Sequence, residues 1–280
     1  MVLLWCGGCD RDTSSSSTAP SPTEAKAVAS PRTATATKNP PDESLPADQY
    51  IPLGLPAYDR PWTGQDMTVA AGKLQTLAAT APQQLPRRKS AKSGAMFDRI
   101  TGRDNLAFFR SQSLPLSARL PQAMEYLQSL NAILKTYLAA MQAGKVSGGE
   151  LVDLLAAELS VVQVALELVD EFVPTLSKDD PKYPVRMAGL ERMRQGLATM
   201  VSGTLTALTE SRVYDVDSRS RLLARSIETF PGIVPKLTAP SRAEVRRRLD
   251  ELVDDPSVRE LRAQVIELRD AVRRTSGADM

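Results

Sequence analysis

The sequence predicts an all-α fold. Its longest apolar segment, residues 150–173, repeats apolar side chains at steps of three and four, which places them on one face of an α-helix. The same periodicity recurs over residues 118–143 and 185–210, and no segment shows the strict alternation typical of a β-strand. We therefore expect a bundle of roughly seven or eight helices, in which these three long helices form an antiparallel core.

Pairs of turn and capping residues mark where two of the helices begin. Ser147 and Glu150 have the spacing of a capping box, in which each side chain accepts from a backbone N–H of the other residue, so they open the central helix. Ser241 and Glu244 repeat that spacing and predict the start of a second, highly charged helix.

The composition limits the function. The chain has 280 residues, of which 42% are hydrophobic and 24% charged, as in ordinary globular proteins. Its net charge of +2 produces no strong attraction to nucleic acid, and an aromatic content of 5% leaves few side chains on which bases could stack. We expect no nucleic-acid partner.

The chain contains no histidine, and its two cysteines, Cys6 and Cys9, both lie at the N-terminus. The folded part therefore lacks the usual general base, the usual partner of a serine or cysteine nucleophile, and the ligands of a Cys/His metal site. No catalytic or cofactor-binding motif is present either. The sequence predicts a protein that is not an enzyme and has no cofactor or metal; an enzyme that uses carboxylates alone is a less favoured alternative.

Residues 1–9 read MVLLWCGGC, a short apolar run followed by two small residues and a cysteine. This segment resembles the end of a bacterial lipoprotein signal peptide. The resemblance implies that Cys9, or alternatively Cys6, is lipidated and anchors the chain in the cell envelope, facing the periplasm or the cell surface. An incidental N-terminus and a redox or metal-binding Cys-x-x-Cys pair are the competing interpretations.

More than half of the residues between Thr13 and Pro46 are serine, threonine or proline, so we interpret residues 10–46 as a disordered tether. Residues 47–65 combine repeated prolines with apolar side chains, which predicts an extended strap on the domain surface. Residues 66–275 are expected to form a single α-helical domain.

Glu158 is the one residue that breaks the apolar face of the central helix. On a helical wheel it is surrounded by Leu151, Leu155, Val162 and Ala165. A buried carboxyl group must pair with a cation or stay neutral with a raised pKa. We favour a structural role, either a buried ion pair, with Arg186 and Arg194 as candidate partners, or a hydrogen-bonded group that fixes the helix register.

The functional interpretation of Glu158 is a general acid or a ligand-binding carboxyl group in a pocket. Asn131, which lies within the apolar seam of the preceding helix, and Arg194 would be further ligand-binding residues. For Asn131, as for Glu158, we favour a polar group that is satisfied inside the bundle.

Two patterns bear on the space between the long helices. Gly189, Gly196 and Gly203 recur every seven residues, which indicates either chance or a groove where another helix approaches closely. Five methionines are concentrated in the three long helices, either as core-filling residues, which we favour, or as an adaptable apolar binding surface. They are Met124, Met141, Met187, Met193 and Met200.

A basic cluster follows Pro86 and comprises Arg87, Arg88, Lys89 and Lys92. On a lipid-anchored domain it could touch phosphate headgroups. Four charges are too few to define a binding patch, so we favour a solvated loop.

These observations predict a non-enzymatic, lipid-anchored α-helical protein of the cell envelope that acts by binding an unknown protein partner, as a scaffold, assembly factor or immunity-type protein. The alternative is a helical pocket that binds an apolar or lipid ligand, with Glu158 as its polar handle.

Overall fold

The computed structural model describes residues 40–111 and 114–276. Within these ranges the chain folds into helices joined by turns, with no β-strand, so the all-α prediction is confirmed. None of the described helices is both long enough and apolar enough to cross a lipid bilayer. The lipidation predicted at Cys9 or Cys6, and the tether up to residue 39, lie outside the described residues.

The long helices begin and end close to their predicted positions. In chain order the α-helices are α1 (Gly64–Thr80), α2 (Gly94–Thr101), α3 (Ala107–Arg110), α4 (Leu116–Gln142), α5 (Gly148–Phe172), α6 (Tyr183–Thr209), α7 (Val216–Ile233), α8 (Ala239–Asp254) and α9 (Arg262–Ser276). Short 3₁₀ segments connect several of them.

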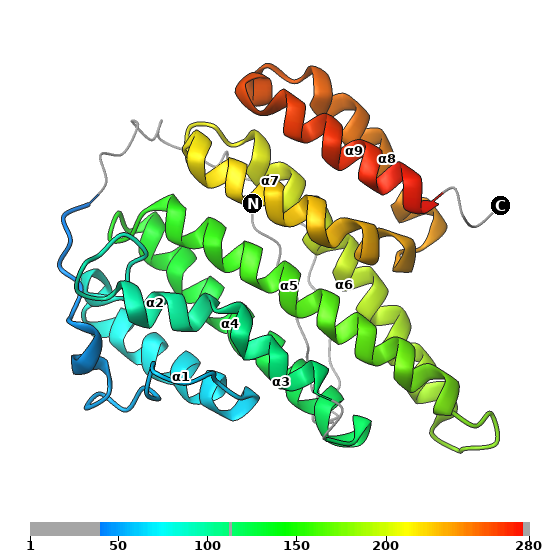
Figure 1. The fold of residues 1–280 in the computed structure, drawn as a ribbon, viewed down its shortest axis with the longest axis horizontal. Helices are drawn as coiled ribbons and strands as arrows, with labels where there is room; N and C mark the ends of the chain where they lie inside the picture. The colour runs from blue at the N-terminus through cyan, green and yellow to red at the C-terminus, as the bar shows by residue number, and fades with distance from the viewer. Residues whose placement is uncertain (1–39, 112–113, 277–280) are drawn as a thin grey trace, which may run out of the picture.

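Helix α5 lies at the centre of the molecule. It packs against α4 on one side and α7 on the other (Figure 1). The N-terminal helices α1 to α3 gather around α4, whereas α8 and α9 pack on each other and α9 packs on α7. Nearly all of α5 is therefore covered, which its apolar sequence requires.

The capping box at the start of α5 is confirmed: the Ser147 hydroxyl accepts from a backbone N–H in the first turn, and the Glu150 carboxylate accepts from the Ser147 backbone. The predicted box at Ser241 is wrong. Helix α8 begins three residues earlier, where the Thr238 hydroxyl accepts from the Ser241 N–H. Pro240 occupies the first turn, where the missing proline N–H has no intrahelical partner to lose.

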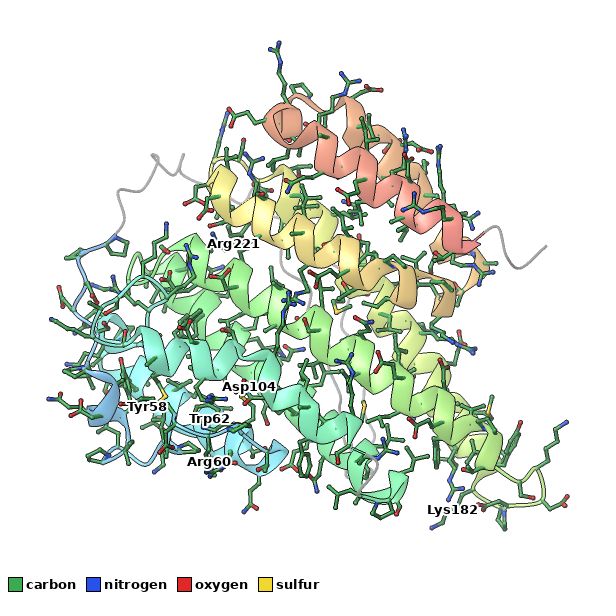
Figure 2. All side chains as sticks on the ribbon, in the orientation of Figure 1. Tyr58, Arg60, Trp62, Asp104, Lys182 and Arg221 are labelled. Atoms are coloured by element: carbon green, nitrogen blue, oxygen red, sulfur yellow. The ribbon has the colours of Figure 1, made fainter. Side chains whose placement is uncertain are left out.

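Residues 47–63, which we call the strap, fold as a 3₁₀ turn (Ala47–Tyr50) followed by irregular chain. Its side chains Tyr50, Leu55 and Trp62 are buried against α1, α2 and their neighbours. Figure 2 shows Trp62 beside Tyr58, Arg60 and Asp104 on this side of the molecule. The strap is thus part of the folded core rather than a loose cover.

Helix α6 packs on the C-terminal half of the molecule. Its buried apolar side chains are Leu197, Val201, Leu205 and Leu208. The Arg248 guanidinium on α8 donates to the backbone oxygen of Ser202 at 3.0 Å and to the Thr206 hydroxyl at 3.0 Å. The long loop before α6 carries Lys182 at the far end of the molecule (Figure 2). The other face of α6 looks toward α4 and α5 across open space.

Candidate functional site

A cavity of about 400 Å³ lies between α4, α5 and α6, and we call it the central cavity. Its walls are mainly Leu, Val, Ala and Met side chains from the three helices. Four of the five methionines noted in the sequence line it: Met124, Met141, Met193 and Met200. Met141, Met193 and Met200 also pack against the hydrophobic core, so these methionines both fill the core and line the cavity.

The small residues of α6 keep this space open. Gly196 and Gly203 both line the central cavity. A Cβ atom added at Gly203 would meet no heavy atom within 4 Å, and the same holds at Gly189, which lies outside the cavity lining. Within the described ranges, no helix approaches either of these two glycines closely.

Glu158 lies on the α5 wall of the cavity, together with the four neighbours predicted for it from the helical wheel. Only 7% of its surface is exposed. Among the described residues it makes neither an ion pair nor a side-chain hydrogen bond. Burial raises the pKa of the Glu158 carboxyl to about 7, against a smaller lowering effect from the charge of Lys135 on α4.

The predicted arginine partners of Glu158 are elsewhere. Arg186 pairs with Asp180 at 2.8 Å, and Arg194 pairs with Glu191 at 3.4 Å on the exposed side of α6. Neither arginine lines the cavity, so Arg194 is not part of this site. The ion-pair interpretation of Glu158 is therefore wrong.

Asn131 does line the central cavity, as Glu158 does. The structure thus brings together two of the three predicted ligand-binding residues. The sequence interpretation missed Lys135, which is exposed on α4 and lines the same space. It follows Asn131 by four residues, so it shares a helix face with it, and this spacing was the available signal.

The central cavity has few ionisable groups. Besides Glu158 they are Lys135 on α4, Glu210 at the end of α6, and Tyr214 just after α6. Lys135 and Glu210 are exposed to solvent. Tyr214 is buried, and burial raises the pKa of its hydroxyl to about 12, so it stays neutral. Glu158 is the one carboxyl group that lies deep in the described part of this wall.

The cavity is long and Glu158 lies near its middle. Its α4 wall extends from Met124 to Gln142, which at 1.5 Å per residue is about 27 Å. On α5 the lining extends from Leu151 to Leu166, seven residues before Glu158 and eight residues after it. Apolar walls therefore continue on both sides of the carboxyl group.

Within the described lining of the cavity, no second carboxyl group lies on the same helix wall as Glu158. The described residues also contain no cluster of three or more acidic, cysteine or histidine side chains that could hold a metal ion.

The basic cluster after Pro86 is engaged within the molecule. Arg88 pairs with Asp153 at 3.0 Å and with Asp217 at 3.4 Å, which joins this loop to α5 and α7. Arg87 is buried and donates to the backbone oxygens of Pro40 and Lys145. These two arginines connect elements of the fold, and this leaves little free charge for headgroups.

The central cavity is the strongest candidate site in the described part of the chain. Comparison with protein-family models, with curated proteins and with solved structures finds no match to this chain.

Proposed function

We propose that this chain is a non-enzymatic binding protein that holds an apolar small molecule in the central cavity, with Glu158 as the polar contact. The observation that carries this proposal is an unpaired, buried carboxyl group in a mainly apolar cavity. Burying such a group without a partner costs free energy. A ligand that supplies the missing partner accounts for its presence.

The volume of the cavity supports a small ligand. Pockets for small molecules measure about 300–1,000 Å³ and are mostly apolar with a few polar groups, which describes this one at about 400 Å³. Methionine side chains adapt to ligands of irregular shape because they are unbranched and polarisable.

The shape of the cavity favours a chain-like ligand over a partner helix. The lining of the cavity extends along about 27 Å of α4, so the cavity is long for its volume of about 400 Å³. A single extended chain suits this long shape better than an α-helix, which is about 10–12 Å across with its side chains. We accordingly prefer a small apolar ligand to the protein partner that the sequence first suggested.

Filling the cavity from α6 is expected to abolish binding. We predict that Gly203→Leu, which adds a side chain at the exposed edge of the cavity lining where no atom obstructs its Cβ, reduces the fluorescence increase of Nile red, a neutral apolar dye, at least tenfold. Gly189→Leu is the matched control, because it lies on the same helix, is equally unobstructed and is outside the cavity.

The two variants separate binding from folding. Both exchange a helical glycine for a better helix former, so both should be at least as stable as the wild type. Equal Nile red binding by Gly203→Leu and Gly189→Leu would count against the central cavity as the site.

We further propose that Cys9 carries a lipid that keeps this binding domain at a membrane surface, where apolar molecules are concentrated. The support is the Gly7-Gly8-Cys9 sequence followed by the polar tether. Metabolic labelling with a clickable fatty acid should label the wild type and leave Cys9→Ser unlabelled, with Cys6→Ser as the control. Wild-type protein that stays unlabelled in its native host would contradict the anchor.

A further inference from the structure

We infer that the ligand is an elongated apolar molecule that carries an amine near the middle of its length. This inference rests on the proposed function and specifies its ligand. It follows from where Glu158 lies along the cavity and from which charges face it.

The position of Glu158 along the cavity determines where along the ligand its polar group must lie. Helices α4 and α5 are joined by a short turn, so Glu158 is level with Asn131 and Lys135 on α4. These residues lie midway between the two ends of the α4 wall, Met124 and Gln142. A polar group at the Met124 end of the ligand would lie against apolar walls, about 12 Å from Glu158. At the Gln142 end it would lie near Glu210, which is exposed to solvent, and Glu158 would again be left without a partner.

The charged residues of the cavity lining determine the sign of the charge that the ligand carries. From α4 the one charged residue of the lining is Lys135, from α5 it is Glu158, and from α6 it is Glu210, while Tyr214 is neutral. With Glu158 ionised, the described lining has two carboxylates and one ammonium group. A ligand cation would balance this charge, whereas a ligand carboxylate would increase the excess.

The lack of a hydrogen-bond donor to Glu158 indicates which chemical group the ligand carries. The described residues supply no donor to either carboxylate oxygen, and Lys135 forms no ion pair with it. An ammonium group on the ligand would donate to the carboxylate and neutralise it, which is a charge-assisted hydrogen bond. An ether oxygen cannot donate at all, so it leaves an ionised Glu158 unpaired.

Three probes of similar length test the inference by isothermal titration calorimetry with the full chain at pH 8. Dioctylamine has its nitrogen between two octyl arms, dioctyl ether replaces that nitrogen with oxygen, and hexadecylamine has its nitrogen at one end. We expect dioctylamine to bind about tenfold to a hundredfold more tightly than either of the others, as a hydrogen bond to a charged group would give.

The effects of Glu158→Gln and of pH on dioctylamine affinity test whether Glu158 binds the ligand amine. In Glu158→Gln the preference for dioctylamine over dioctyl ether should disappear, whereas Glu167→Gln, an exposed position on the same helix, should retain it. Ammonium binding requires the ionised carboxyl, whose pKa in the empty cavity is about 7. The wild-type affinity for dioctylamine should therefore rise as pH increases toward 7 and level off above it, and Glu158→Gln should show no such rise.

Every other outcome of these titrations contradicts either the inference or the proposed function. Equal affinity for dioctyl ether and dioctylamine would overturn the amine while leaving an apolar ligand in place. Tighter binding of hexadecylamine would overturn the central position. Binding of Nile red without binding of any of the three would overturn this inference alone, and failure to bind Nile red as well would overturn the proposed function.

Discussion

Replacing Trp62 with alanine is expected to reduce the free energy of unfolding by about 3–5 kcal/mol, as for other fully buried aromatic side chains. Trp62 is 1% exposed, and its indole N–H donates to the backbone oxygen of Ala57 at 2.8 Å. The substitution leaves a cavity under the strap and removes that hydrogen bond. The Trp62 backbone N–H still donates to the Asn105 side chain at 2.7 Å, so the effect measures the side chain.

Urea denaturation followed by circular dichroism would measure this loss. Leu53→Ala is the control, because Leu53 lies on the same strap but is 45% exposed, so its loss should change the free energy of unfolding by no more than about 0.5 kcal/mol. A loss below about 1 kcal/mol for Trp62→Ala would mean that the strap contributes little to the core.

The parts of the fold that follow from local geometry were predictable. The three long helices appear where the three- and four-residue steps place them, because helical period depends on neighbouring residues alone. The four residues predicted around Glu158 line the central cavity with it for the same reason. Side-chain spacing on a helix is fixed before any tertiary contact forms.

The parts that depend on distant elements were not predictable. The sequence suggested two arginines of α6 as partners for Glu158, but both pair with nearby acids. Part of the apolar seam of α6, including Met193 and Met200, faces the central cavity, and the remainder packs on the C-terminal helices. The packing of α6 on α7 and α8 decides which face of α6 lies toward α5. No local sequence pattern in α5 reveals that packing. For this reason the choice between ion pair and pocket required the structure.

Asn105 shows a second limit. It is fully buried, accepts from the Trp62 backbone, and donates to the Arg99 backbone oxygen and to the Tyr126 hydroxyl, both at 2.8 Å. It therefore joins the strap, α2 and α4. It lies in a short 3₁₀ segment (Arg103–Leu106) with no period from which to infer a face, so its role could not be predicted from local pattern.

Replacing Glu158 with glutamine is expected to stabilise the ligand-free protein at alkaline pH by about 3 kcal/mol. The pKa of the carboxyl is raised from 4.5 to about 7 by burial, and each pH unit of difference between the folded and unfolded states is worth about 1.4 kcal/mol. Below pH 4.5 the carboxyl is protonated in both states and costs nothing. Between 4.5 and about 7 the unfolded chain loses its proton first, so the wild type loses stability as pH rises.

Urea midpoints at pH 5 and pH 8 would reveal this dependence. The wild type should be less stable at pH 8 relative to Glu158→Gln, and the difference should shrink toward pH 5. Glu167→Gln, which removes an exposed carboxylate paired with Arg110, controls for the general effect of losing a charge on α5, and should shift stability by less than about 1 kcal/mol at either pH. A wild type whose stability relative to Glu158→Gln is the same at both pH values would show that Glu158 is solvated or paired. In that case neither a ligand cation nor an apolar cavity would be needed to explain it.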